Sequence, residues 1–571
     1  MSYDWTSART ALGLADRREQ TELFERVLAD PANLIGVEGP TGIGKSALVA
    51  PIVGSGERVV YSARSKAQQH QMAVFADEKL LPGKLLSTWA LLFGRNEYVC
   101  LRRAQEAGYR LGTTLRGDGS RRHYPDVDEL DWGSVNSDGD QGCSAKRCGP
   151  DDARNVAVAR AREADLVITN HNVLMLSSQI PAHVSPLGET FDRTLIVDEA
   201  HDLPGVISDT LGCSVSPARL TKAAGLFRRS TGRVSAIERA APIWRELLQS
   251  YRDTPEAVWH HQETALALGR AVHVEASKMD DGDRGPLDRL ALDLALLGDP
   301  DDEIAYSMSV EAPFSANPKA VAKALITSQP AKELFGQYEQ TFVMSATLTG
   351  LPASQLGLDT LHVGDSPFDL VDRRLGYVTS KVSKAGDDWE VEELGRLIES
   401  VGGRGALVLA TSYSQKERAG DELEALGYRV GLQGKGSSGV GELVEQFKAG
   451  RLDVLVGTDS LMTGIDIPGD ALRLVVLLKW PTPAFKRPFE AAMALRLRAR
   501  GLNEWSYYFD PVAEVKARQS VGRLIRTTAD YGVVACLDPR QRNKMRFRRL
   551  VAPSTYTSEL ADVSSFVGGF E

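Results

Sequence analysis

The stretch NLIGVEGPTGIGKSALVAPIV, residues 33–53, decides the fold of this chain. An apolar run leads into the segment from Gly39 to Ser46, which fits the pattern GxxxxGK[ST], and a helix-forming run follows. Strand, glycine-rich loop and helix in this order are typical of a phosphate-binding loop in a parallel α/β protein. The glycines let backbone N–H groups face the phosphates at a helix N-terminus, which already favours anions. An ordinary glycine-rich turn is the alternative, and the spacing and context together disfavour it.

The loop also predicts individual ligands for a nucleoside triphosphate and its magnesium ion. Lys45 can reach the β- and γ-phosphates, and the Ser46 hydroxyl can bind Mg²⁺. The other residues expected around the phosphates are Gly39, Pro40, Thr41, Gly42, Ile43 and Gly44.

A second motif, LIVDEAH at residues 195–201, delivers two adjacent carboxylates at the end of an apolar strand. Ligands of open α/β sheets bind at the carboxyl ends of the strands. We expect Asp198 to hold Mg²⁺ through water and Glu199 to orient and polarise the attacking water. The alternative is an acidic turn that caps a helix, which the phosphate loop upstream disfavours.

A third motif, QSVGRLIR at residues 519–526, carries two arginines. Arg523 and Arg526 lie three residues apart, and so on one face if the segment is helical. An arginine that reaches the γ-phosphate from a second domain contributes roughly 10³ to 10⁵ in rate. A solvated basic helix face is the commoner role of such a pair, so this prediction requires a second α/β domain that faces the first.

Two segments alternate short apolar strands with helical stretches, the pattern of parallel α/β sheets. The strands expected in the first sheet are 34–37, 59–61, 166–169, 195–197 and 342–345, and those in the second are 406–410, 454–457, 474–478 and 532–537. Residues 95–155 interrupt the first sheet with a polar, glycine-rich stretch that holds three cysteines. Residues 205–325 interrupt it again, and apolar residues at helical spacing in 233–251 and 286–298 predict helices there.

Composition predicts a large globular protein without a membrane anchor. At about 150 residues per domain, 571 residues indicate three to four domains. A net charge of −9 gives no support for nucleic-acid binding and does not exclude it, because a motor can confine its basic residues to one groove. Five scattered cysteines, no signal-peptide core and no bilayer-length apolar run favour a cytoplasmic protein.

Nine motifs in order resemble those of superfamily 2 DEAH-type DNA helicases of the XPD/DinG family. Besides the three above, they are RREQ at 17–20, VVYSARSKAQQHQM at 59–72, ADLVITNHNVL at 164–174, SATL at 345–348, ALVLATSYSQ at 406–415 and GTDSLMTGIDIPG at 457–469. The resemblance implies an α/β fold of two RecA-like motor domains with parallel sheets. It places the first motor domain at 1–94, 156–204 and 326–370, an iron–sulfur-type insertion at 95–155, a helical arch at 205–325 and the second motor domain at 371–571.

The resemblance also implies roles for residues that spacing alone does not assign. Arg17 and Gln20 lie on the adenine side of the nucleotide, Asp466 contributes to nucleotide binding, and His201 and Gln519 join the catalytic set. The implied DNA contacts are Ser62, Arg64, Thr169, Ser412, Tyr413 and Thr463. Such contacts reach mainly phosphates and sugars, so binding is expected to be sequence-tolerant and sensitive to salt.

The cysteine-containing insertion departs from the family pattern, in which four cysteines hold a [4Fe–4S] cluster. Cys100, Cys143 and Cys148 match the first three, and CGPDDARN at 148–155 offers aspartates instead of a fourth cysteine. A cluster with Asp152, or less readily Asp151, as its fourth ligand is favoured, and a carboxylate ligand would make it labile or redox-shifted. Zn²⁺ on the same residues, or a vestigial site held by packing, are the alternatives.

Aromatic and basic residues offer weaker signals for DNA binding. Trp89, Trp132, Tyr413 and Trp480 are candidates to stack on bases, although core packing is the commoner role of each. The run KWPTPAFKRPF at 479–489 predicts either a basic rim beside the strand or a plain solvated loop.

The sequence therefore predicts an ATP-dependent DNA helicase, monomeric, that acts on single-stranded and forked duplex DNA with 5′-to-3′ polarity. The expected setting is DNA repair, replication or a phage or CRISPR-associated element, with a larger nucleoprotein complex as a further partner. An RNA helicase or a protein-displacing translocase remains an alternative. A non-enzymatic adapter is disfavoured because Lys45, Asp198, Glu199 and Arg523 are all present.

Overall fold

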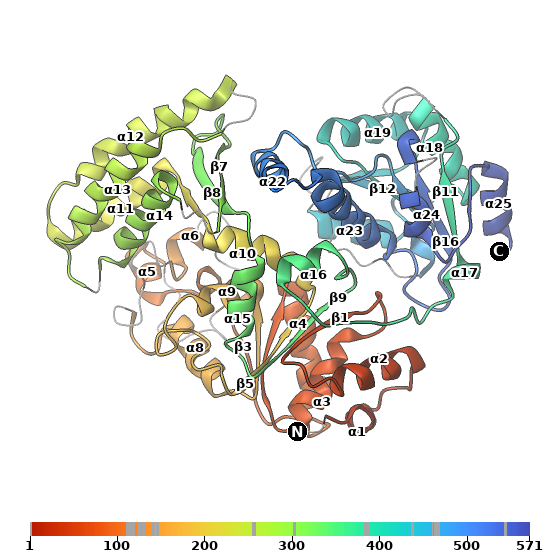
Figure 1. The fold of residues 1–571 in the computed structure, drawn as a ribbon, viewed down its shortest axis with the longest axis horizontal. Coiled ribbons are helices and arrows are strands. Elements are labelled where there is room, and N and C mark those ends of the chain that lie inside the picture. Colours follow the sequence, from red (N-terminus) through yellow and green to blue (C-terminus); the bar gives the residue numbers. More distant parts are fainter. Residues whose placement is uncertain are drawn as a thin grey trace.

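The computed structural model describes residues 3–109, 120–123, 127, 132–138, 143, 148–253, 258–281, 283–300, 304–381, 389–434, 439–458, 461, 467, 469–541 and 545–570. Figure 1 shows two α/β domains side by side, with a helical lobe (residues 213–324) above the first of them. The first α/β domain lies at the bottom of the view, the second at the right and the lobe at the upper left.

The first α/β domain is built on a parallel sheet, which among the described residues has seven strands in the order β10-β1-β9-β5-β2-β4-β3. The strands are β1 (Leu34–Glu38), β2 (Arg58–Ala63), β3 (Trp89–Leu91), β4 (Leu166–Asn170), β5 (Arg193–Val197), β9 (Gln340–Ser345) and β10 (Leu361–Val363). β2 and β5 are neighbours, with Ser62 opposite Val197, so the loops that follow them leave the sheet side by side.

Burial on both faces explains why the strands of this sheet are continuous apolar runs. Every residue of β5 is buried; Leu195 and Val197 belong to the core on one face, and Ile196 to the core on the other. Parallel sheets covered by helices on both sides require this composition.

The second α/β domain contains a parallel sheet of the same size in its described part, in the order β13-β14-β12-β15-β16-β11-β17. Its strands are β11 (Arg374–Val378), β12 (Ala406–Leu409), β13 (Val430–Leu432), β14 (Val454–Gly457), β15 (Leu474–Leu477), β16 (Gly532–Cys536) and β17 (Tyr556–Thr557). All nine strands predicted from the sequence are present, which confirms the α/β fold with two parallel sheets. The strands that the sequence did not predict are mostly at sheet edges.

Helices cover both sheets. In the first α/β domain they are α1 (Trp5–Ala11), α2 (Arg18–Leu28), α3 (Val49–Gly54), α4 (Lys66–Phe75), α8 (Ala153–Glu163), α9 (His171–Ser178), α10 (Leu203–Leu211), α15 (Ser328–Phe335) and α16 (Leu351–Leu356). In the second they are α17 (Leu370–Arg373), α18 (Trp389–Ser400), α19 (Tyr413–Ala425), α20 (Val440–Lys448), α22 (Pro488–Ala499), α23 (Asp510–Val521), α24 (Met545–Val551) and α25 (Leu560–Gly568).

The helical lobe contains α11 (Pro217–Thr231), α12 (Ala236–Gln249), α13 (Gln262–Ala276) and α14 (Gly285–Gly298). α12 and α14 confirm the helices predicted at 233–251 and 286–298. The lobe also contains an antiparallel sheet that the sequence did not predict, formed by β6 (Cys213–Val215), β7 (Tyr306–Glu311) and β8 (Lys319–Ala324). Its strands are rich in alanine, serine and lysine, which carry little strand propensity, so only their pairing reveals them.

The cysteine-containing segment between β3 and α8 includes α5 (Leu101–Glu106) and α6 (Trp132–Val135). Tyr98, Val99, Trp132 and Val135 from this segment belong to the same buried cluster as the first sheet. The described part of the insertion is therefore packed onto the first α/β domain. Among the described residues, no helix is both long enough and apolar enough to cross a bilayer.

Candidate nucleotide and nucleic-acid sites

The predicted phosphate loop connects β1 to a 3₁₀ turn at Lys45–Leu48, which leads into α3. Gly42 and Gly44 have φ angles of 87° and 84°, a left-handed conformation that glycine adopts without a steric penalty. The buried Lys45 Nζ donates to the Gly39 carbonyl at 2.7 Å, across the loop. The Ser46 hydroxyl donates to Asp198 Oδ2 at 3.2 Å.

The start of α2 is attached to the phosphate loop. Arg17 Nη1 donates to the Gly42 carbonyl at 3.0 Å, and Gln20 Nε2 donates to the Gly44 carbonyl at 3.2 Å. The structure therefore brings the two predicted adenine-side residues together with the phosphate loop.

The DEAH motif places its carboxylates at the end of β5. Asp198 Oδ2 accepts from Ser46 and from the Tyr61 hydroxyl, and burial, with the nearby charge of Glu199, raises the pKa of Asp198. Glu199 adopts a left-handed backbone conformation, with φ 51° and ψ 43°. A Mg²⁺ ion suits this donor set, since a serine hydroxyl and a carboxylate are hard oxygen ligands.

His201 links the DEAH carboxylates to a neighbouring strand. Its Nδ1 lies 2.8 Å from Ser345 Oγ and 3.3 Å from Glu199 Oε2, and its Nε2 lies 3.3 Å from Asp202 Oδ2. Burial opposes protonation, but the Asp202 and Glu199 carboxylates outweigh it and raise the pKa of His201 to about 9. Burial also opposes ionisation of Glu199, yet the His201 hydrogen bond and the Lys45 charge lower its pKa to about 2. At neutral pH Glu199 is therefore a carboxylate held beside an imidazolium.

The second α/β domain contacts the phosphate loop through the end of α23. Thr41 Oγ1 donates to the Gly522 carbonyl at 2.8 Å, and Gln519 Nε2 lies 3.4 Å from Thr347 Oγ1. The premise that Arg523 and Arg526 share a helix face is wrong: α23 ends at Val521, with Gly522 as its C-cap, and both arginines follow in a turn and a loop. The other requirement is met, because this loop faces the first domain.

Glu38, at the end of β1, connects the phosphate loop to the SATL segment, and no sequence motif indicates this role. Its Oε2 accepts hydrogen bonds from the backbone N–H of Leu348, at 2.6 Å, and of Thr349. Arg518 Nη1 of α23 lies 3.7 Å from Glu38 Oε1. One half-buried carboxylate thus contacts the SATL segment and the second α/β domain.

The predicted DNA contacts differ in their exposure. Ser62 and Thr169 are fully buried; the Ser62 hydroxyl lies 2.7 Å from His171 Nδ1, and Thr169 donates to the Leu92 carbonyl. Ser412 caps α19, and Tyr413 is 71% exposed. Arg64 pairs with Asp202, with Nε and Oδ2 2.6 Å apart. Thr463 and the nucleotide candidate Asp466 lie outside the described residues.

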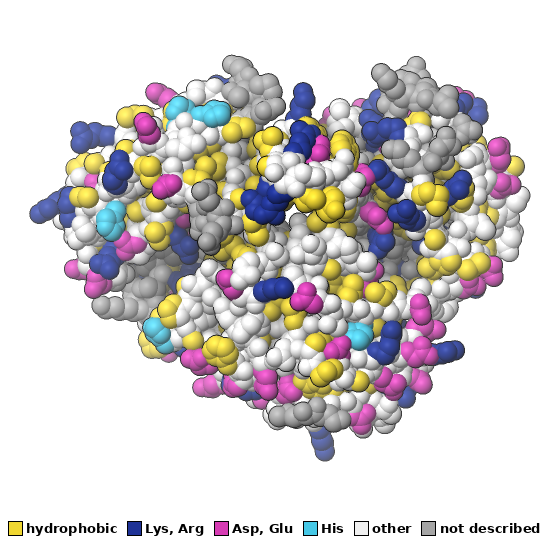
Figure 2. All heavy atoms as spheres, viewed as in Figure 1, with side chains coloured by type: hydrophobic (Ala, Val, Ile, Leu, Met, Phe, Trp, Pro, Cys, Tyr) yellow, Lys and Arg dark blue, Asp and Glu magenta, His cyan; other side chains and the backbone are white. Residues whose placement is uncertain are grey.

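An aromatic cluster on the second α/β domain was not found from the sequence. Phe485 and Trp505 stack with their ring centroids 6.4 Å apart and an angle of 8°, and both are exposed. Trp505 opens a π-helical turn, Trp505–Phe509, and Arg498 lies over the Phe485 ring. Five basic residues and one acidic residue lie between positions 485 and 500. Figure 2 shows lysine and arginine side chains gathered between the lobe and the second domain, where Figure 1 places α22.

The tryptophans proposed to stack on bases occupy other environments. Trp480 and Trp132 are buried in the cores, and Trp89 donates its Nε1–H to Asp77. Cys536 is buried in β16.

Three cysteines meet in the insertion. The sulfur atoms of Cys100, Cys143 and Cys148 all lie within 4.8 Å of one another, a separation at which one metal centre can bind all three. Asp152 is buried beside them and caps α8, and burial with the nearby Cys148 raises its pKa; its carboxylate lies outside that group of sulfurs. Asp151 is exposed. The donor set fits a metal or an iron–sulfur cluster, with Asp152 as the nearer carboxylate.

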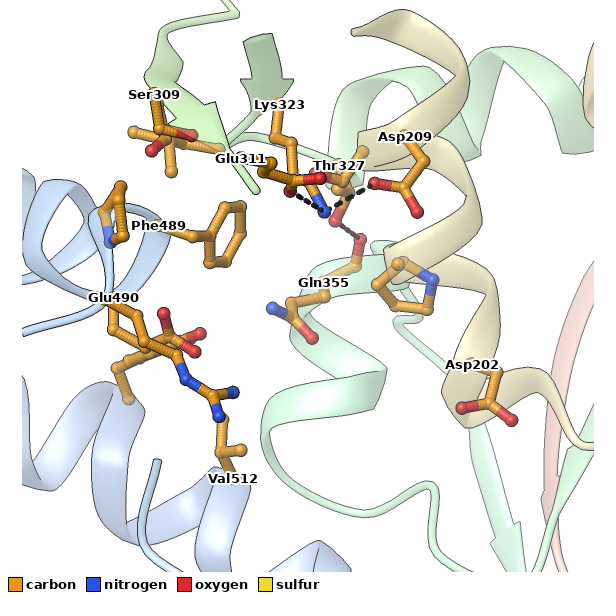
Figure 3. Close-up of a pocket in the computed structure, with 18 of the residues that line it drawn as sticks. Asp202, Asp209, Ser309, Glu311, Lys323, Thr327, Gln355, Phe489, Glu490 and Val512 are labelled. Carbon is orange, nitrogen blue, oxygen red and sulfur yellow. Dashed lines mark hydrogen bonds and ion pairs between the residues drawn. The ribbon is translucent and has the colours of Figure 1, made fainter. Parts of the chain in front are cut away.

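A cavity of about 590 Å³ lies where the first α/β domain, the lobe and the second α/β domain meet (Figure 3). Lys323 of β8 lies 3.2 Å from Asp209 of α10 and 3.7 Å from Glu311 of β7. Phe489 and Glu490 of α22 face these residues from the second domain. Carboxylates outnumber cations in its lining, so the cavity does not favour the binding of a phosphate group. It lies at the interface of the two α/β domains and the lobe.

Known proteins similar to this chain include helicases. Residues 394–553 match the family model described as Helicase C-terminal domain. The chain is 27% identical to the ATP-dependent DNA helicase YoaA of Escherichia coli, over 94% of this chain and 93% of the relative. It is 28% identical to the ATP-dependent helicase DinG of Mycobacterium tuberculosis, over 93% and 92%. A solved XPD helicase structure covers 95% of this chain and 100% of its own, with a TM-score of 0.61 and 16% identity. These findings confirm the resemblance drawn from the motifs.

Proposed function

Since the chain is related to the XPD/DinG helicases over nearly its whole length, we propose that it is an ATP-dependent DNA helicase that translocates on single-stranded DNA. The contact between Thr41 of the phosphate loop and Gly522 of the second α/β domain carries this proposal. A nucleotide bound at that junction touches both domains, so its hydrolysis can change how they sit against one another.

The proposed nucleotide site assigns one role to each part of this junction. Lys45 and the loop N–H groups hold the phosphates, and Ser46 and Asp198 hold Mg²⁺. Glu199 orients the water, because a carboxylate with a pKa near 2 is a weak base but a good hydrogen-bond acceptor. The second domain supplies Arg523 and, beside it, Gln519 and Arg526; Arg17, Gln20 and Asp466 complete the nucleotide contacts.

The proposed DNA path crosses both sheets at the carboxyl ends of their strands, where the motifs lie. Arg64 and the exposed Tyr413 are the described side chains best placed to meet a strand, and Phe485 with Trp505 forms a stacking platform beside basic residues. Aromatic stacking is sequence-tolerant and contributes about 1–3 kcal/mol per base. The family resemblance supports 5′-to-3′ movement, a forked duplex as substrate, a monomeric motor, and a setting in repair, replication or a phage or CRISPR-associated element.

For the insertion, we propose that Cys100, Cys143, Cys148 and Asp152 hold a [4Fe–4S] cluster. The sulfur positions and the buried carboxylate support this ligand set, and Zn²⁺ is the alternative occupant. Such a cluster supplies a redox-active cross-link of the segment that holds it. Asp152 caps α8, so its ligation would fix the insertion to the first α/β domain.

The proposal is tested with forked DNA that carries a single-stranded arm of either polarity. Unwinding that needs Mg-ATP and a 5′ arm is expected, and the Lys45→Ala variant serves as the inactive control. Unwinding only from a 3′ arm would reverse the polarity, and ATP turnover stimulated by RNA but not by DNA would change the substrate. Turnover that neither nucleic acid stimulates would contradict a helicase.

A further inference from the structure

The residue that follows the DEAH motif, Asp202, joins two sites that the proposed function treats separately. On one side its Oδ2 lies 2.6 Å from Arg64 Nε, the proposed DNA contact. On the other side the same Oδ2 lies 3.3 Å from His201 Nε2, and His201 Nδ1 lies 3.3 Å from Glu199 Oε2. From this chain of contacts we propose that Asp202 is a positioning residue that couples DNA binding at Arg64 to the water-orienting Glu199. The inference rests on the proposed function and deepens it.

The topology explains why these groups meet. β2 and β5 are hydrogen-bonded neighbours, and the loops after them carry Arg64 and the DEAH motif. Ser345, at the end of β9 on the other side of β5, bonds to the same His201 Nδ1. Three parallel strands thus deliver a DNA-facing cation, a hydrolytic carboxylate and the SATL segment to one imidazole.

The Asp202 side chain does not perform the structural task that its position would suggest. Asp202 is the N-cap of α10, where an aspartate ordinarily accepts hydrogen bonds from the first N–H groups of the helix, yet it makes no such bond. Its carboxylate is directed instead toward Arg64 and His201. These contacts join two side chains on different elements, whereas a capping residue would contact the backbone of its own helix.

The exposure of Arg64 and His201 indicates that the coupling runs from the protein surface inward. The Arg64 side chain is about one-third exposed, whereas His201 is almost fully buried. Asp202 lines the cavity in Figure 3, at the side opposite Glu490. A DNA phosphate that binds Arg64 competes with the Asp202 carboxylate, because both anions pair with the same guanidinium. Asp202 then pairs more strongly with His201, and the imidazole withdraws from Glu199, which becomes free to orient the attacking water.

The test compares Asp202→Asn with wild type in ATP turnover with and without saturating single-stranded DNA. Couplings between sites typically amount to 5–150-fold, so the stimulation by DNA is expected to fall at least fivefold. DNA affinity is expected to persist, because Arg64 keeps its charge, and Asp202→Glu is expected to recover part of the stimulation. Asp209→Asn is the matched control, since Asp209 lies on the same helix and pairs with Lys323 instead. This control is expected to keep the wild-type ratio.

A double variant distinguishes coupling from a general loss of structure. If Arg64 and Asp202 act along one route, their effects do not add. DNA then stimulates ATP turnover of the double variant, Arg64→Gln with Asp202→Asn, as much as it stimulates the more impaired of the two single variants. Wild-type stimulation in Asp202→Asn would overturn the inference while leaving the helicase proposal intact. Equal loss of turnover with and without DNA, or loss of DNA affinity, would also overturn it, because each indicates a structural role. A wild-type enzyme that DNA does not stimulate would overturn the proposed function itself.

Discussion

Replacing Glu38 should loosen the SATL segment by an amount that follows from its contacts. One carboxylate oxygen accepts from two N–H groups, those of Leu348 and Thr349. In Glu38→Ala the N–H of buried Leu348 loses its acceptor, at a cost of about 1–3 kcal/mol, whereas water replaces the bond to the exposed Thr349. The loss is therefore about 2 kcal/mol. Glu38→Gln keeps the oxygen but not the charge, which roughly halves the bond strength and predicts about 1 kcal/mol.

Amide hydrogen exchange measures this change where it occurs. Since 1.4 kcal/mol corresponds to a factor of about ten, exchange at the amides of Leu348 and Thr349 should accelerate about 30-fold in Glu38→Ala and about fivefold in Glu38→Gln. The amides of β12, in the other domain, serve as the internal control and should not change. Equal acceleration in both variants would refute the role of the charge, and no acceleration in either would refute the role of Glu38 in holding the segment.

Four further predictions concern the proposed nucleotide and metal sites. Lys45→Ala should abolish ATP turnover and unwinding with circular dichroism unchanged; retained turnover would remove the phosphate-loop assignment. Glu199→Gln should bind ATP but hydrolyse it about 10²- to 10⁴-fold more slowly, and a wild-type single-turnover rate would exclude its role. Arg523→Ala should lose about 10³-fold or more in DNA-stimulated turnover with little change in nucleotide affinity; a loss of affinity alone would mean that it positions the nucleotide. Protein purified without oxygen should contain about four iron atoms per chain, and less in Asp152→Ala; zinc at about one per chain, or neither metal, would contradict the cluster.

The sequence predicted the parts of the fold that local chemistry determines. The central strands are apolar runs because they are buried on both faces, and the phosphate loop is recognisable because its glycines are needed for left-handed backbone at Gly42 and Gly44. Strands of two or three residues at sheet edges, such as β3 and β17, carry too few residues for a periodic pattern. The end of α23 was also missed, although Gly522 is a residue type that commonly ends helices.

The candidate site was predictable residue by residue but not as a network. Lys45, Asp198 and Glu199 stand in recognisable motifs. Glu38 and Asp202 act through partners far away in the sequence, at Leu348 and Arg64, and a single sequence does not show which distant residues will meet. The stack of Phe485 on Trp505 has the same origin, because a loop and a π-helical turn bring the two rings together.

The left-handed backbone at Glu199 has a consequence for thermal stability. A side chain at φ 51° costs about 1–2 kcal/mol that a glycine at this position would not. Glu199→Gly would remove this cost, but it would also take a carboxylate away from the buried His201, and the pKa of about 2 shows that this carboxylate stabilises the fold at neutral pH. The strain at this position is therefore offset by the pairing of Glu199 with His201, and melting curves of Glu199→Gly and Glu199→Gln would separate the backbone cost from the lost charge.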